Sequence, residues 1–143
     1  MNTRNLRFRS NVMQDVIALY KTELGGLYEE GEIVSFMKML SEWILGWDTL
    51  KYLTSKNEHI NQSDLLKFHW ALEELKQHRP IQHIIGWVTF CGCEIEVNND
   101  VLIPRPETEE IVTKTVSITK NPNRIADLCC GSGCIGIALK KAF

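Results

Sequence analysis

The hydrophobic pattern of the chain changes at Arg79-Pro80, and this change constrains the fold more than any other feature. From Asn11 to about His78, apolar residues recur every three or four positions, which is the spacing of helices that bury one face. After Pro80 they alternate with polar residues, as they do in strands. The sequence therefore predicts an α+β protein whose helical part comes first.

The helical part divides into four segments joined by short links. Their apolar stripes are Val12, Val16, Leu19 and Tyr20; Ile33, Phe36, Met37, Leu40, Trp43 and Ile44; Leu50 and Leu53; and Leu65, Leu66, His69, Leu72 and Leu75. Gly25-Gly26 interrupts the first segment, and Gly46 suits the C-terminus of the second. Asp48 and Ser63 suit the N-caps of the third and fourth. Four such helices form a small bundle, so we expect residues 1–78 to be an N-terminal helical domain.

A β-hairpin and then a helix are predicted after Pro80. Residues 87–90 and 93–97 flank Cys91-Gly92, which fits a hairpin and makes residues 79–103 a linker. Pro106 suits the first turn of the helix, and acidic residues follow at its positive end. The expected apolar face is Ile111, Val112, Thr115, Val116 and Ile118, and Asn121-Pro122-Asn123 is expected to break the helix.

The last part of the chain predicts a strand, a glycine-rich loop and a second helix. Residues 124–128 fit a short strand, and residues 134–141 fit the start of a helix. Between them, Gly131 and Gly133 allow a sharp turn, and the helix N-terminus offers unpaired N–H groups to a carboxylate or phosphate. Strand, loop and helix in this order open a doubly wound α/β domain, so we expect residues 104–143 to begin one.

Two classes of ligand use such a loop. Residues 131–136, GSGCIG, match the dinucleotide fingerprint G-x-G-x-x-G. Asp127, four positions before Gly131, instead suits a ligand with an ammonium group, such as the methionine part of S-adenosylmethionine. A nicotinamide-binding oxidoreductase stays an alternative interpretation of the loop, although this interpretation gives Pro104-Arg105-Pro106 no role. A second alternative is a buried strand-turn-helix that binds no ligand.

Charge and hydropathy argue against several classes of partner. The net charge is −2, and residues 94–110 carry six acidic side chains against one basic one, which disfavours direct binding of nucleic acid. No stretch is apolar enough to span a membrane, and residues 1–11 lack the apolar segment of a signal peptide. We therefore expect a cytoplasmic protein that has no membrane partner.

The five cysteines are then expected to be reduced thiols. A structural zinc site is the alternative, with ligands from Cys91, Cys93, Cys129, Cys130 and Cys134. Paired C-x-x-C knuckles are absent, and the strand-loop-helix pattern accounts for Cys129 and Cys134, so we expect no bound metal.

Three segments together resemble a known family. LIPRPETEE at 102–110 stands about twenty positions before DLCCGSGCIG at 127–136, and RPIQHIIG at 79–86 precedes both. In this order they resemble the HemK-type peptide chain release factor glutamine methyltransferases, from about Arg79 to the last residue. Over residues 1–78 the resemblance is one of architecture.

The resemblance implies a transferase that uses S-adenosylmethionine. In this family the methyl group goes to the side-chain amide nitrogen of the glutamine in the Gly-Gly-Gln motif of a peptide chain release factor, and the helical domain helps to recognise that factor in translation termination. A relative that methylates a ribosomal protein carries Ser-Pro-Ile after the Pro-Arg pair, where this chain has Pro106-Glu107-Thr108. The ribosomal-protein reading is kept as an alternative.

The resemblance also assigns residues to the site by position. The cofactor-binding residues are Asp127, Cys129, Cys130, Gly131, Ser132 and Gly133, and the residues of the substrate and cofactor pocket are Arg105, Pro106, Glu107 and Thr108. Cys129 takes a position that is usually glycine in the family. No catalytic residue is assigned, because the family's Asn-Pro-Pro-Tyr motif does not occur in these 143 residues.

The expected fold is therefore a helical bundle, a hairpin linker and the first β-loop-α unit of a truncated Rossmann-like methyltransferase domain. We expect the chain alone not to catalyse methyl transfer, and a protein-binding helical module is the alternative function. Beyond residue 121 we expect a segment that is mobile, swapped or paired with the hairpin, because a lone strand has open edges.

Overall fold

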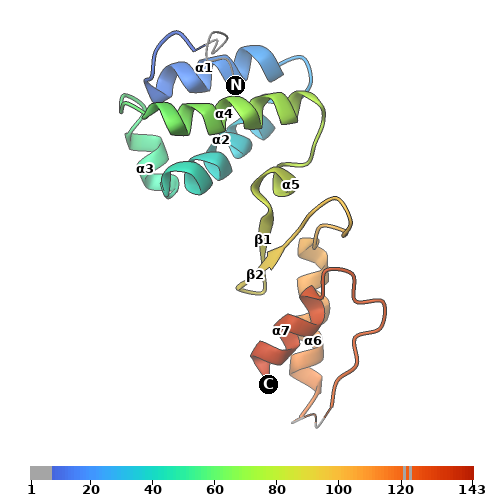
Figure 1. Ribbon diagram of the computed structural model, residues 1–143. Coiled ribbons are helices and arrows are strands. Elements are labelled where there is room, and N and C mark those ends of the chain that lie inside the picture. Colours follow the sequence, from blue (N-terminus) through green and yellow to red (C-terminus); the bar gives the residue numbers. More distant parts are fainter. Residues whose placement is uncertain (1–7, 121, 123) are drawn as a thin grey trace. The chain divides into compact units, whose positions relative to one another are not determined.

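Figure 1 shows the computed structural model, which describes residues 8–120, 122 and 124–143. The chain divides into two compact units, the first ending at Ile85 and the second beginning at Gly86. Each unit has a hydrophobic core of its own. Helices and a two-stranded sheet are both present, in agreement with the α+β prediction.

The described part of the first unit contains α1 (Met13–Leu24), α2 (Glu30–Leu45), α3 (Thr49–Thr54), α4 (Gln62–Lys76) and α5 (Ile81–Ile85). Helices α1, α2 and α4 pack against one another in pairs, and α3 and α5 pack on α2. The four helices predicted from the sequence are confirmed. None of the helices in the described residues is both long and apolar enough to cross a membrane.

Helix α5 is a difference from the sequence prediction, which has residues 81–85 at the start of a hairpin linker. The N–H groups of His83 and Ile84 donate to the carbonyl of Pro80, so the proline begins a helical turn. Ile81 and Ile84 are buried in the core of the helical unit. The hairpin strands begin only after this turn, at Trp87.

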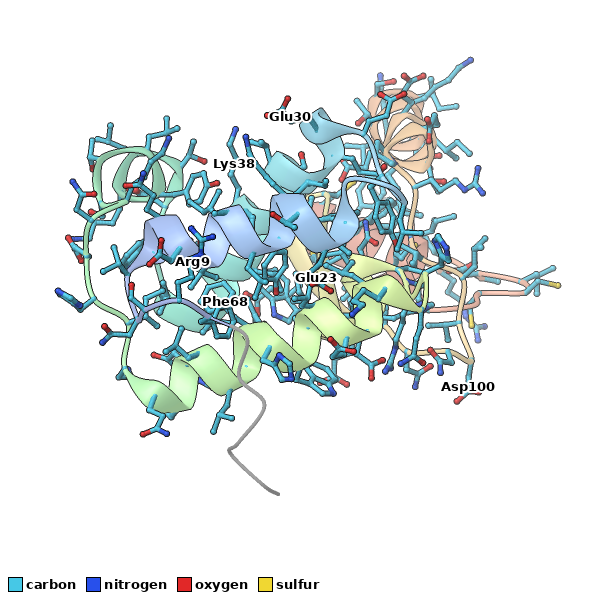
Figure 2. All side chains as sticks on the ribbon, turned by 90° about the horizontal axis from the view of Figure 1, so that it is seen from above. Arg9, Glu23, Glu30, Lys38, Phe68 and Asp100 are labelled. Atoms are coloured by element: carbon cyan, nitrogen blue, oxygen red, sulfur yellow. The ribbon has the colours of Figure 1, made fainter. Side chains whose placement is uncertain are left out.

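The core of the helical unit is built from the predicted stripes of α1, α2 and α4. Phe68 lies on the side of α4 that faces α1 (Figure 2). Its ring and the Tyr20 ring are nearly perpendicular, with centroids 6.4 Å apart. The Tyr20 hydroxyl donates to the Phe68 carbonyl at 2.6 Å, and the Tyr28 hydroxyl donates to the Leu75 carbonyl at 2.7 Å. These bonds satisfy the hydroxyls of the buried Tyr20 and the half-buried Tyr28. Each fully buried apolar side chain of the core contributes roughly 1.5–3 kcal/mol.

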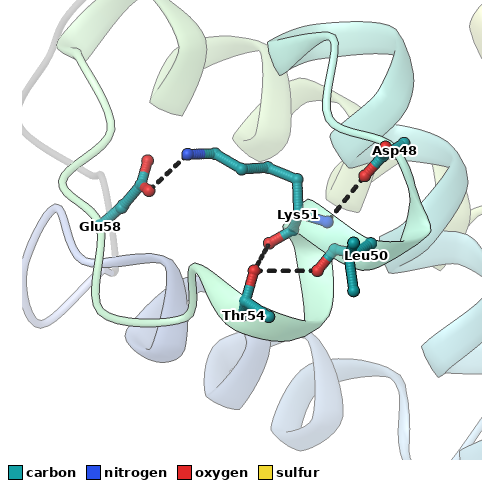
Figure 3. Close-up of polar contacts among 5 residues, drawn as sticks. All are labelled: Asp48, Leu50, Lys51, Thr54 and Glu58. Carbon is teal, nitrogen blue, oxygen red and sulfur yellow. Dashed lines mark hydrogen bonds and ion pairs between the residues drawn. The ribbon is translucent and has the colours of Figure 1, made fainter.

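Two of the predicted helix caps are confirmed and one is wrong. Gly46 ends α2 in the left-handed conformation, with φ of 67°. The Asp48 carboxylate accepts from the Lys51 N–H at 2.7 Å at the start of α3 (Figure 3). At the start of α4, however, the cap is Asn61, whose side-chain oxygen accepts from the Asp64 N–H at 2.9 Å. The predicted cap, Ser63, lies inside the helix and donates to Asn61 instead.

The apolar stripe predicted for α3 is also wrong. Leu50 and Leu53 are 70% and 51% exposed, whereas Tyr52 is 3% exposed. Helix α3 has six residues and packs on α2, so one side chain of its short face reaches the core. An ion pair of 2.6 Å between Lys51 and Glu58 links α3 to the loop that follows it (Figure 3).

The second unit contains β1 (Trp87–Phe90), β2 (Cys93–Glu96), α6 (Pro106–Ile118) and α7 (Cys134–Ala142) among its described residues. The strands pair antiparallel with Phe90 opposite Cys93, so Cys91 and Gly92 form the whole turn. Both have positive φ, 48° and 70°, as a two-residue turn matched to the twist of a hairpin requires. The predicted hairpin is therefore confirmed, and so is the helix predicted to begin at Cys134.

One prediction for this unit is wrong, and another is confirmed in part. Residues 124–128 are not a strand, because β1 and β2 pair with each other and no described strand pairs with this segment. The predicted apolar face of α6 is confirmed in part: Val112 is buried and Val116 packs against the core of this unit, whereas Ile111 and Ile118 are 57% and 73% exposed. Asn121 and Asn123 of the predicted helix break lie outside the described residues, as do residues 1–7.

Candidate functional site

The glycine-rich loop forms a tight turn that leads directly into α7. Cys129, Gly131 and Gly133 have φ of 59°, 56° and 74°, so every second residue of the turn is left-handed. Gly133 is the N-cap of α7, and its N–H donates to the Cys130 carbonyl at 2.8 Å. Glycine adopts this conformation without strain, whereas cysteine carries a β-carbon that disfavours it.

Asp127 folds back onto the first turn of α7. Its Oδ2 accepts from the Gly136 N–H at 3.0 Å, so the carboxylate occupies one of the amides that the helix itself leaves unpaired. A β-carbon added to Gly136 would lie 3.1 Å from the same oxygen, which explains why glycine suits this position. The sequence predicts Asp127 as the partner of a ligand's ammonium group, whereas in the structure its contact is with the Gly136 N–H of the helix.

The remaining residues of the loop are open to solvent. Cys129, Cys130 and Gly131 are exposed, and Ser132 and Gly133 are half-buried. The helix N-terminus beside them favours a negatively charged group through its partial positive charge. A ligand at this loop could therefore reach the main chain between Cys130 and Gly133.

The second predicted segment forms the start of α6. Arg105 is the N-cap residue, Pro106 opens the first turn, and the Thr108 N–H donates to the Arg105 carbonyl at 2.9 Å. Arg105, Pro106 and Glu107 are exposed and Thr108 is half-buried. None of the hydrogen bonds described for the chain joins this segment to the loop at 127–133, so the structure forms both segments without a direct polar link between them.

Glu109, one of the acidic residues expected at the start of α6, also makes a polar contact with the hairpin that the sequence does not predict. Its Oε1 accepts from the Cys91 N–H at 2.9 Å and so ties α6 to the turn of the hairpin. The Lys141 ammonium group donates to the Gly92 carbonyl at 2.7 Å and ties α7 to the same turn. Both helices of this unit are therefore held to one end of the hairpin, a link between distant residues that sequence spacing does not reveal.

A shallow groove of about 560 Å³ runs along α6. Its lining is Pro106, Glu109, Glu110, Thr113, Lys114 and Ser117. Of the predicted pocket residues it includes Pro106, and it includes no residue of the glycine-rich loop. The groove is one open helix face, which is not a shape that encloses a nucleoside-sized ligand.

The cysteines are free thiols in different surroundings. Cys93 and Cys134 are buried in the core of the second unit, Cys91 is half-buried, and Cys129 and Cys130 are exposed. Burial raises the pKa of the Cys91 thiol, and the nearby Glu109 carboxylate adds to this shift. Within the part of the chain that the structure describes, no three His, Cys, Asp or Glu side chains are placed to hold a metal ion.

The fold and the loop define a class of two-unit α+β protein, with a helical first unit and a second unit in which a glycine-rich turn opens a helix. Comparison with known proteins makes this class more specific. Residues 21–86, which cover most of the helical unit, match the family model described as the PrmC N-terminal domain.

Curated relatives extend the match into the second unit. The chain is 35% identical to the release factor glutamine methyltransferase of Flavobacterium psychrophilum over 135 residues, 88% of this chain and 47% of that protein. It is 34% identical to the protein of the same name from Bacillus subtilis over 133 residues, 89% of this chain and 46% of that protein. It is also 34% identical to the Clostridium botulinum protein of that name over 119 residues, which are 80% of this chain and 42% of that protein.

The resemblance predicted from the sequence is thereby confirmed, and the chain is a relative of the release factor glutamine methyltransferases. It spans about half the length of the curated relatives that it matches.

Proposed function

We propose that this chain is part of an S-adenosylmethionine-dependent methyltransferase that modifies the glutamine side chain in the Gly-Gly-Gln motif of a cytoplasmic peptide chain release factor. The observation that carries the proposal is the similarity to proteins named release factor glutamine methyltransferase over 80–89% of the chain. The PRPET segment and the glycine-rich loop in the sequence add to it.

The structure supports a role for the loop in binding the cofactor. S-adenosylmethionine carries a carboxylate, an ammonium group and two ribose hydroxyls, and the α7 N-terminus and Asp127 offer a complementary pair of charges at one turn. When the cofactor is bound, Asp127 would exchange its contact with the Gly136 amide for the ligand's ammonium group. The N–H groups at the start of α7 would then be available to the carboxylate.

Methyl transfer to an amide requires positioning above all. The amide nitrogen is a weak nucleophile because its lone pair is delocalised into the carbonyl group. The enzyme must therefore hold the amide by hydrogen bonds in line with the methyl carbon, and such positioning can supply a large part of the rate. Since these 143 residues contain no Asn-Pro-Pro-Tyr motif to hold the amide, we propose that the chain by itself binds without turning over.

Calorimetric titration of S-adenosylmethionine into the 143-residue chain tests the proposed loop function. Saturable binding that is lost in the Gly131→Ala/Gly133→Ala variant is the expected result, because both positions need positive φ. The matched control is Gly26→Ala, since this exposed glycine of the helical unit has open space around it and no positive φ. Binding that is absent, or equal in all three proteins, would contradict the role of the loop.

A second candidate function is supported by the helical unit. Trp43 and Trp70 approach with ring centroids 6.3 Å apart, and Met39, Leu66 and Trp70 are 39%, 41% and 36% exposed on α2 and α4. Aromatic and methionine side chains are enriched in protein interfaces. We therefore propose these residues as the contact through which the unit recognises a release factor.

A binding assay with a purified release factor tests this contact. Trp70→Ala is expected to weaken binding about tenfold or more, as loss of an interface anchor does. Leu50→Ala is the control, because Leu50 is an exposed leucine on α3, outside the proposed contact. Equal affinity of the Trp70 variant and the unmodified chain would rule the contact out.

A further inference from the structure

Two adjacent cysteines stand at the centre of the glycine-rich loop and are both open to solvent. Cys129 and Cys130 are exposed and free, whereas Cys93 and Cys134 are buried and Cys91 is half-buried. A reagent in solution therefore reaches the pair at 129 and 130 first. No role in packing accounts for them, since neither belongs to the hydrophobic core of the unit.

Adjacency in the chain keeps these two cysteines together whatever the rest of the loop does. Their α-carbons are joined by one peptide unit and are about 3.8 Å apart. Cys129 is already held in the left-handed conformation, with φ of 59°. The Cys130 carbonyl accepts the N–H of Gly133, the N-cap of α7, so the pair lies inside the turn that positions the helix N-terminus.

We propose that Cys129 and Cys130 form a dithiol modification site. The two thiols form a disulfide with each other when the chain reacts with a low-molecular-weight disulfide. The thiolate of one cysteine attacks a sulfur of the small disulfide and releases one small thiolate. The second cysteine thiolate then attacks the mixed disulfide, forms the Cys129–Cys130 bond and releases the second small thiolate. The two cysteines lose two electrons and two protons, and the small disulfide is reduced to two thiols.

Adjacency makes this closure reversible. Disulfides usually join α-carbons 4.4–6.8 Å apart, so a bond between neighbours about 3.8 Å apart is strained. Strained and exposed disulfides have higher reduction potentials and are easily reduced again. The site is therefore suited to respond to changing thiol and disulfide levels and not to stabilise the fold, and this holds whether or not the loop binds S-adenosylmethionine.

Mass spectrometry of the 143-residue chain tests the proposal, with glutathione disulfide as the oxidant. Cleavage after Arg124 and Lys140 releases residues 125–140, which contain Cys129, Cys130 and Cys134. The expected product is this peptide with the mass of two hydrogen atoms missing and no glutathione attached. Treatment with a monothiol reductant is expected to restore the original mass.

Three variants identify the bond. Cys134→Ser is expected to lose the same two hydrogens, because Cys134 is buried and takes no part. Cys130→Ser is expected to keep glutathione on Cys129, since no neighbour can displace it. In Cys129→Gly, where glycine suits the positive φ, glutathione is expected to stay on Cys130. Stable glutathione adducts on the unmodified chain, or a hydrogen loss that disappears in Cys134→Ser, would overturn the proposal.

Discussion

At the scale of single residues, positive φ angles mark the positions where the backbone of this chain turns most sharply. In the helical unit the example is Gly46, which ends α2 with φ of 67° and has no atom within 4 Å of where a β-carbon would be. The cost of a side chain there would be conformational and not steric. The effect of a substitution at Gly46 on stability therefore comes from the backbone conformation, and no neighbouring side chain needs to repack.

We predict that Gly46→Ala destabilises the helical unit by about 1 kcal/mol, because alanine disfavours the left-handed conformation. Gly31→Ala, in the first turn of α2 where φ is not positive and space is free, should stabilise the unit by about 0.5–1 kcal/mol instead. Urea unfolding followed by circular dichroism measures both. Two changes of the same sign would show that the positive φ of Gly46 does not decide its identity.

The thiol of Cys91 gives a prediction of pH dependence. Burial raises the pKa of this thiol, and the Glu109 carboxylate adds to the shift, so the group stays neutral to a higher pH than in the unfolded chain. Its contribution to stability is therefore present below the unfolded pKa and is lost as the pH rises through the folded pKa. Alkylation of Cys91 by iodoacetamide should begin at a higher pH in the folded chain than in urea.

Glu109→Gln separates charge from hydrogen bonding at this thiol. The amide oxygen of glutamine can still accept the Cys91 N–H, which Glu109 accepts at 2.9 Å, but it carries no charge. The alkylation profile of Cys91 should therefore move to lower pH in this variant. A profile that stays in place, or moves to higher pH, would mean that the carboxylate does not act on the thiol.

At the scale of elements, side-chain caps decide where the helices of the first unit begin. The cap of α4 is Asn61, which accepts from the Asp64 N–H, whereas Ser63 contacts Asn61 from inside the helix. We predict that Asn61→Ala destabilises the helical unit by about 1 kcal/mol, since an N–H of the first turn loses its partner. Ser63→Ala should cost less than about 0.5 kcal/mol.

Thermal or urea unfolding of these two variants gives the comparison directly. Asp48→Ala, at the cap of α3, is a second test, because this carboxylate accepts from the Lys51 N–H in the same way (Figure 3). A larger loss of stability for Ser63→Ala than for Asn61→Ala would restore the cap position that the sequence pattern favoured.

At the scale of the whole molecule, the described residues form two hydrophobic cores, one in each unit. The core of the helical unit includes Phe68, which is fully buried, and the core of the second unit is the smaller set around Phe90, Ile95 and Leu139. Because no described residue belongs to both cores, we expect damage to one not to unfold the other. The units are expected to lose structure in separate steps.

We predict that Phe68→Ala destabilises the helical unit by about 3–5 kcal/mol, through lost burial and the cavity that remains. The amides of β1 and β2 should keep their protection from hydrogen exchange in this variant, since their core is intact. Leu50→Ala, at a position 70% exposed, is the matched control and should change stability by less than about 0.5 kcal/mol. Loss of hairpin protection in Phe68→Ala would show that the two cores are coupled.

Amide exchange also tests the segment that was expected to be a strand. Ile125 and Leu128 are 46% and 85% exposed, and none of the described backbone hydrogen bonds protects residues 124–128. We predict fast exchange for these amides and slow exchange for the last turns of α7, from Ala138 on. Slow exchange throughout residues 124–128 in a monomer would mean that the segment is paired.

The sequence by itself determined the features that depend on neighbours along the chain. Gly46 ends a helix, Pro106 opens one, and Cys91-Gly92 turns a hairpin, because each depends on the φ preference of the residue and on the pattern on either side. The glycine-rich loop before α7 was predictable for the same reason. Its resemblance to a methyltransferase family rests on residue types in order, which the sequence displays in full.

The tertiary structure alone decided which predicted faces are covered. Tyr52 and not Leu50 or Leu53 faces the core from α3, because α2 offers contact on one side. Ile81 and Ile84 join the helical core as α5, although their pattern alone also fits an extended linker. Residues 124–128 stay unpaired, because a strand needs a second strand beside it and no described strand supplies one. Local preference fixes turns and caps, whereas burial and strand pairing depend on partners that are distant in the sequence.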